Sequence, residues 1–184
     1  MKSSQSGFTM IEVLVTLVIL LIGLLGLAAL QSRAQVLETE SYQRTQALVL
    51  LRDISDRLSA NRVDAASYVT GTTYGQGSGL DCAATPPTNT ATRDLCEWDA
   101  ALKGAAEASG GACTAGGANC VGAMIGGRGC VTSPAANQYL IQVVWQGMLP
   151  TAPPPAAVPC GSGSYGNDAT RRAVTTLVQF GNLL

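Results

Sequence analysis

Residues Gly7 to Leu30 decide the fold, and they read GFTMIEVLVTLVILLIGLLGLAAL. The 18 residues from Val13 to Leu30 are almost wholly apolar, and no charged residue occurs between Val13 and Gln31. An apolar helix of this length nearly spans the hydrocarbon core of a bilayer. The segment therefore predicts a single membrane-spanning helix at about residues 10–31.

A secretory signal peptide is the alternative interpretation of this segment, because it also has a short positive start and an apolar stretch. Two features argue against it. The apolar run exceeds the ~7–15 residues of a typical signal. No small-x-small cleavage site follows it, since the chain continues as LQSRAQVLETE. We therefore expect the apolar segment to stay in the mature protein.

The helix is expected to continue well beyond the apolar run. No proline occurs before Pro86. After Ser32 the pattern becomes amphipathic, with one stripe of apolar residues at helical spacing: Ala47, Leu48, Leu51, Ile54 and Leu58. We predict one continuous N-terminal helix over residues 8–62, whose second half has an apolar face on which a domain can pack.

The composition changes abruptly after Arg62. The remaining residues, 63–184, hold all six cysteines, all eight prolines and 18 of the 21 glycines. Such a segment predicts short elements joined by many turns. We expect it to be one exported globular head.

Three elements of the head are predicted from periodicity. A helix is expected at Arg93–Ala108, with Thr92 as its N-cap and Gly110 at its end. Residues 137–147 and 171–181 alternate apolar and polar side chains, which predicts two antiparallel strands. The predicted fold class is α+β, a long helical stem packed on a small antiparallel, disulfide-bonded head, and the sequence contains no internal repeat.

Charge and composition argue against several functions. The formal net charge is −1, so nucleic acid is not expected as the primary ligand. The absence of histidine removes Ser-His-Asp and Cys-His catalysis and imidazole metal sites. The glycine-dense segment at residues 110–130 lacks the Gly-Lys-Ser/Thr ending of a phosphate loop. We expect no enzymatic activity, no cofactor and no metal. Catalysis by unpaired residues such as Asp168 and Ser164 is a remote alternative. Trp98 and Trp145 are expected to be core anchors.

The six cysteines are Cys82, Cys96, Cys113, Cys120, Cys130 and Cys160. They form no C-x-x-C pair, so a zinc ribbon or a thioredoxin-like site has no support. An even number in an exported head favours disulfides, with free buried thiols as the alternative. Fifteen pairings are possible, and the sequence alone does not choose among them. We favour the pairing of neighbours: Cys82–Cys96, Cys113–Cys120 and Cys130–Cys160.

The N-terminal motif SGFTMIEV, directly before the apolar run, resembles the type IV pilins and the pseudopilins of secretion systems. The resemblance implies that a prepilin peptidase removes a leader, residues 1–7, by cutting after Gly7. It also implies that the enzyme methylates the new N-terminus, Phe8, and that Glu12 is the fifth mature residue.

Glu12 has a physical reason to matter in such a protein. A carboxylate in a helix that enters a bilayer costs about 2–3 kcal/mol at depth. When stems pack in a fibre, the N-terminal amine of a neighbouring subunit can neutralise it and fix the register between helices. The alternative is that Glu12 lies at the membrane surface in water.

A finer resemblance, to the PilV-type minor pilins, rests on four features: the stem sequence Ala47–Arg62, Cys96-x-Trp98, the strand IQVVWQG and Cys160-Gly161. It implies the pilin fold and a role in starting pilus assembly or at the pilus tip. Within the stem sequence, Asp53 and Arg57 are also spaced as an ordinary surface pair at i,i+4.

The resemblance implies a structural subunit rather than an enzyme. Its expected partners are other major and minor pilins through their stem helices, the prepilin peptidase and an inner-membrane assembly platform. It implies a single-pass inner-membrane protein with a periplasmic head, later part of a cell-surface pilus used for twitching motility, adhesion or DNA uptake. The alternatives are a minor pseudopilin of a type II secretion system and a tip adhesin.

Overall fold

The computed structural model describes residues 7, 9–76, 82, 89–104 and 124–181. The elements are α1 (Met10–Ala60), the 3₁₀ helix η1 (Arg62–Tyr68), α2 (Thr90–Leu102), β1 (Arg128–Ala135), β2 (Gln138–Gln146), the 3₁₀ helix η3 (Asp168–Thr170) and β3 (Arg171–Gln179). The chain divides into two compact units, Met1–Thr39 and Glu40–Leu184. The fold class is α+β, as the sequence predicts.

The first unit contains the N-terminal part of α1. Its side chains from Met10 to Leu30 are exposed and almost all apolar. Among the described residues, α1 is the one helix long and apolar enough to cross a membrane, by length and composition. The prediction of one long continuous helix is confirmed over Met10–Ala60, which is helical without a break. The predicted bounds were residues 8–62; Phe8 lies outside the described residues, and at Arg62 the 3₁₀ helix η1 already begins.

The second unit is built on a three-stranded antiparallel sheet of order β1-β2-β3. The central strand is β2: Ile141 lies opposite Val131 of β1 and opposite Thr176 of β3. Asn137, in the turn between β1 and β2, adopts a φ of 58°, a left-handed conformation that asparagine tolerates better than most residues. The predicted antiparallel pairing of β2 with β3 is confirmed.

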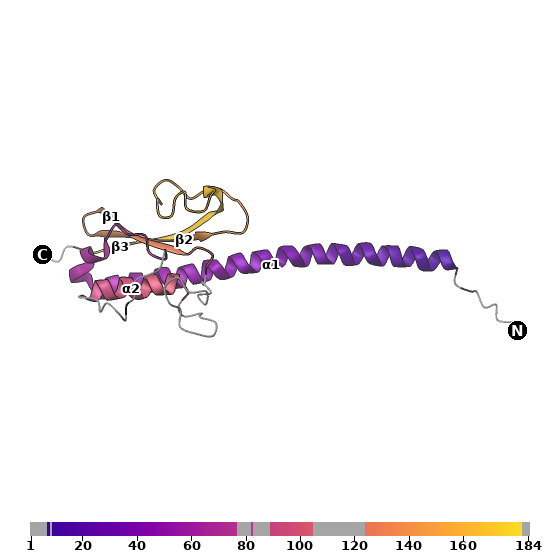
Figure 1. The fold of residues 1–184 in the computed structure, drawn as a ribbon, viewed down its shortest axis with the longest axis horizontal. Coiled ribbons are helices and arrows are strands. Elements are labelled where there is room, and N and C mark those ends of the chain that lie inside the picture. Colours follow the sequence, from indigo (N-terminus) through magenta and orange to yellow (C-terminus); the bar gives the residue numbers. More distant parts are fainter. Residues whose placement is uncertain (1–6, 8, 77–81, 83–88, 105–123, 182–184) are drawn as a thin grey trace. The chain divides into compact units, whose positions relative to one another are not determined.

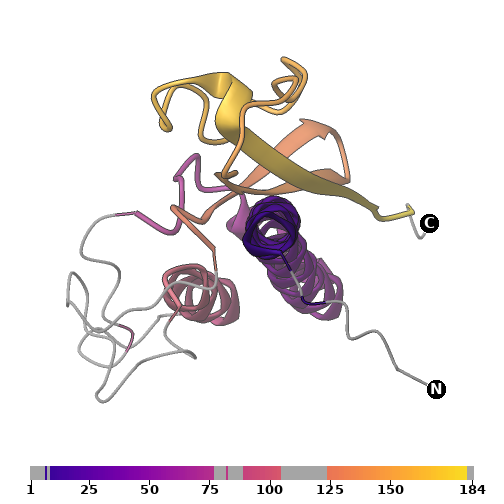
Figure 2. The same ribbon diagram turned by 90° about the vertical axis from the view of Figure 1, so that its right-hand side faces the viewer.

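The inner face of this sheet packs on two helices. Within the second unit, α2 and the C-terminal part of α1 lie side by side under the sheet (Figures 1 and 2). The apolar core that joins these layers is Ala47, Leu51, Ile54, Leu58, Ala65, Tyr68, Tyr74, Ala91, Leu95, Trp98, Leu102, Met124, Val131, Tyr139, Ile141, Val143 and Trp145. The predicted inward alternation of β2 and the core positions of both tryptophans are confirmed.

The stripe predicted on α1 is correct except at one position. Ala47, Leu51, Ile54 and Leu58 are buried, whereas Leu48 is 47% exposed. Successive helical residues point about 100° apart, so Ala47 and Leu48 cannot both face the sheet. The fifth buried residue of α1 is instead Gln43.

The outer face of the sheet is covered by the connection between β2 and β3. Its small apolar cluster consists of Cys130, Val144, Val158 and Cys160, with Tyr165 and Ala173 against it. The buried guanidinium of Arg171 donates hydrogen bonds to the carbonyls of Val158 (2.7 Å) and Cys160 (3.1 Å). These bonds hold the long connection on the sheet.

The predicted bounds of α2 are wrong at both ends. The helix begins at Thr90 and its N-cap is Asn89, whose side-chain oxygen accepts the N–H of Thr92 at 2.7 Å. It ends at Leu102, because Gly104 turns the chain with a φ of 83°, as glycine does after a helix. The predicted end at Ala108 is therefore not reached, and Gly110 lies outside the described residues.

Strand β1 was not predicted from the sequence. Its residues RGCVTSPA include a glycine, a serine and a proline, which weaken the strand signal. Pro134 is accommodated because β1 is an edge strand and its register with β2 shifts between Thr132 and Ala135.

Candidate assembly site

The candidate site is the N-terminal segment around Gly7 and Glu12. Gly7 is exposed, and a Cβ on it would meet no atom within 4 Å. Phe8, the predicted methylated residue, lies outside the described residues. The peptide bond after Gly7 is thus flanked on one side by a small, accessible residue.

Glu12 lies in the first turn of α1. The main-chain N–H of Glu12 donates to the carbonyl of Thr9 at 3.1 Å, which starts the helical hydrogen bonding. A carboxylate there interacts favourably with the positive end of the helix dipole. Among the residues that the structure describes, the Glu12 carboxylate has no hydrogen-bond or ion-pair partner. The Glu12 side chain is exposed.

The surface that follows Glu12 is apolar on all sides. Exposed residues include Val13 (51%), Leu21 (50%), Ile22 (65%) and Leu25 (71%). Leaving such surface in water costs about 25 cal/mol per Å². The helix consequently requires lipid or the apolar surfaces of other chains around it.

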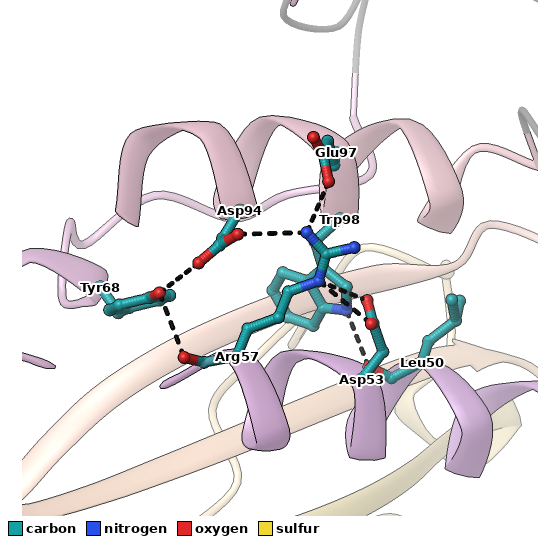
Figure 3. Close-up of polar contacts among 7 residues, drawn as sticks. All are labelled: Leu50, Asp53, Arg57, Tyr68, Asp94, Glu97 and Trp98. Atoms are coloured by element: carbon teal, nitrogen blue, oxygen red, sulfur yellow. Dashed lines mark hydrogen bonds and ion pairs between the residues drawn. The ribbon is translucent and has the colours of Figure 1, made fainter. Parts of the chain in front are cut away.

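A second polar constellation joins α1 to α2 (Figure 3). The Arg57 guanidinium binds three carboxylates: Asp53 at 3.0 Å, Asp94 at 3.1 Å and Glu97 at 2.5 Å. The interpretation of Asp53 and Arg57 as an ordinary surface pair is therefore incomplete. Arg57 also reaches the neighbouring helix, and its long side chain is only 31% exposed.

Arg57 and Tyr68 keep their protons at neutral pH. Burial alone would lower the pKa of Arg57, but hydrogen bonds to Glu97 and Asp53 raise it above the ordinary value. Burial, together with the hydrogen bond that the Tyr68 hydroxyl donates to Asp94, raises the pKa of Tyr68 to about 12. This constellation is a network of ion pairs and hydrogen bonds that fastens α2 to α1.

Asp168, the carboxylate considered for catalysis, serves a local structural role. It receives hydrogen bonds from Arg171, with a closest distance of 2.8 Å, and from the N–H of Gly163 at 3.1 Å. The hydrogen bond from Arg171 and, to a smaller extent, the hydrogen bond from Gly163 lower the pKa of Asp168. In the described part of the chain no three His, Cys, Asp or Glu side chains group as metal ligands.

Two disulfides join cysteines that the structure describes. Cys82 bonds Cys96 and Cys130 bonds Cys160, each with a Cα–Cα distance of 5.9 Å. These are the pairs that neighbour pairing predicts for the four residues. Cys113 and Cys120 lie outside the described residues. The Cys130–Cys160 bond joins β1 to the β2–β3 connection.

The N-terminal segment also matches a known protein family. Residues 2–28 match the prokaryotic N-terminal methylation motif. The match contains Gly7, Phe8, Glu12 and most of the apolar run, and it supports a type IV pilin-like or pseudopilin-like precursor that a prepilin peptidase processes. The chain matches no curated protein and no solved structure.

Proposed function

We propose that the chain is a structural minor pilin of a type IV pilus, closest to the PilV type. The observation that carries the proposal is the methylation motif at residues 2–28, continuous with an exposed apolar helix. A helix with this surface suits both of the environments that a pilin stem occupies, the bilayer and the fibre core. Packing by van der Waals contact can replace lipid without exposing the stem to water.

The proposed processing assigns a role to each N-terminal residue. The leader is residues 1–7, the peptidase cuts between Gly7 and Phe8, and Phe8 becomes the methylated N-terminus. The retained N-terminal segment, residues 8–62, crosses the inner membrane once at about residues 10–31, and the head, residues 63–184, lies in the periplasm. Glu12 then pairs with the N-terminal amine of a neighbouring subunit during assembly. Its lack of a partner among the described residues supports this role.

The two disulfides support a head that folds after export, since such bonds form and persist in oxidising compartments. As a minor pilin the protein would start pilus assembly or belong to a tip complex, with other pilins and the inner-membrane platform as partners. Twitching motility, adhesion or DNA uptake would then depend on it.

The test is the protein composition of purified surface fibres by mass spectrometry. A minor pilin is expected in sheared pili at a small fraction of the major subunit, and in a deletion strain pilus number should fall. Recovery only with the apparatus of type II secretion would instead favour a pseudopilin. Loss of attachment with unchanged pilus number would favour a tip adhesin.

A further inference from the structure

The carboxylate of Glu40 binds a part of the chain more than 100 residues away in sequence. Its Oε1 atom accepts the main-chain N–H groups of Met148 at 3.0 Å and Leu149 at 3.4 Å. The same atom accepts a hydrogen bond from the Arg172 guanidinium at 3.3 Å. One oxygen thus connects α1 both to the start of the β2–β3 connection and to β3.

The Arg172 guanidinium is held in place from the other side. It donates to the carbonyls of Leu149 at 2.6 Å and Ala169 at 3.2 Å, which lie near the two ends of the β2–β3 connection. Gly147 leaves room for it, since a Cβ there would lie 2.7 Å from the guanidinium carbon. The Arg172 side chain is 17% exposed and that of Glu40 25%. These contacts hold the Arg172 guanidinium in place independently of its bond to Glu40.

Glu40 is also the first residue of the second unit. The next α1 residues that are buried in the second unit are Gln43 and Ala47. Among the described α1 residues of the second unit, Glu40 is therefore the first with polar contacts to another element, about one turn ahead of the first fully buried residue, Gln43.

We propose that Glu40 is a positioning residue that fixes the point at which α1 leaves the second unit. Its charge-assisted bonds hold the first turn of the attached helix against the β2–β3 connection. An exposed ion pair contributes little, but this carboxylate also organises two main-chain N–H groups. Without it, attachment would begin at Gln43 or Ala47. The inference goes beyond the proposed function and holds for any fibre into which the protein is built.

The test uses the full-length protein in detergent micelles with its disulfides intact. Spin-labelled non-natural residues replace Ser41 and Ala156, both exposed and both in the second unit. Double electron–electron resonance reports the distance distribution between them. Hydrogen exchange reports the amides of Met148 and Leu149. The variants are Glu40→Ala, Glu40→Gln and Arg172→Ala, and the control is Glu38→Ala, an exposed glutamate one half-turn before Glu40.

Glu40→Ala should broaden the distance distribution and accelerate exchange at Met148 by about tenfold, because one net hydrogen bond is worth about that factor. Glu40→Gln should have a smaller effect, since its carbonyl oxygen still accepts but lacks charge. The distance distribution of the Glu40→Ala/Arg172→Ala double variant should be no broader than that of the more strongly affected single variant. Protease resistance of the head should not change.

The proposal is overturned if Glu40→Ala and Glu38→Ala give the same distribution and the same exchange rate. If Glu40→Ala does not fold, the comparison of Glu40→Gln with Glu38→Gln decides in the same way. Neither readout depends on fibre assembly, so a failure here is distinguishable from a failure of the proposed function.

Discussion

The indole Nε1 of Trp98 on α2 donates a 3.0 Å hydrogen bond to the main-chain carbonyl of Leu50 on α1. The ring of the same residue lies over Gly129 of β1, where a Cβ would overlap it. One buried side chain therefore holds two helices and an edge strand together. Its polar and apolar parts both have partners, as is usual for a buried tryptophan.

This arrangement predicts that Gly129→Ala destabilises the second unit. The added methyl group must displace a ring that is 0% exposed, and such overpacking typically costs about 1–3 kcal/mol. The free energy of unfolding in urea measures the effect. Gly181→Ala is the matched control, because a Cβ there meets no atom within 4 Å. Equal unfolding midpoints for both variants would contradict the packing described here.

Arg57→Ala should also weaken the attachment of α2. It removes the cation shared by Asp53, Asp94 and Glu97, and the Asp94 side chain is only 12% exposed. Because Arg57 itself is partly exposed, we expect a loss of about 1–2 kcal/mol. Urea unfolding again measures it, with Arg52→Ala, an exposed arginine on the same helix, as control. Equal losses in the two variants would show that the network does not stabilise the fold.

The elements predicted correctly are those with local signals. The long helix follows from the apolar run and the absence of proline, and β2 and β3 follow from their alternation. Strand β1 was missed because Gly129 and Pro134 are poor strand residues. Gly129 fits because the Trp98 ring packs against it, and Pro134 fits because β1 is an edge strand. The pairing of Arg57 with Asp53 follows from their spacing on the helix. The bond from Arg57 to Asp94 and that from Arg172 to Glu40 could not be predicted, because these residues are distant in sequence and the tertiary fold alone brings them close.

The Cys130–Cys160 disulfide should contribute about 3–4 kcal/mol, the chain-entropy expectation for a loop of this size, since the two residues are 30 apart in sequence. A Cys130→Ser/Cys160→Ser variant should lose protease resistance in the second unit while the helix still inserts into membranes. Limited proteolysis and membrane fractionation measure the two properties. A double variant as resistant as the parent protein would mean that the bond adds no stability.

Acid should weaken the second unit partly through Asp168. The pKa of Asp168 is lowered in the folded state, mainly by the bond from Arg171, so the unfolded chain binds the proton more readily. The stabilisation is complete above the ordinary pKa of about 4 and is lost as the pH falls through the lower folded value. Asp168→Asn should therefore show a shallower loss of stability between pH 6 and pH 3. Parallel pH profiles of urea midpoints would exclude this contribution.

Glu12→Ala should separate membrane insertion from assembly. Insertion should persist, because the change removes a charge from an apolar helix. Incorporation into fibres should fall at least several-fold, because a neighbouring amine loses its partner. Quantification of the subunit in sheared fibres and in membranes measures both, with Glu38→Ala as control. Equal incorporation of Glu12→Ala and the parent protein would remove Glu12 from the assembly mechanism.

The most direct test of the account is the mass of the mature N-terminal peptide. We expect a mature protein that begins at Phe8 and carries one N-methyl group, and an uncleaved precursor in a strain without prepilin peptidase. A mature protein that keeps Met1, or one that is cleaved after Leu30 as a signal peptide would be, would contradict it.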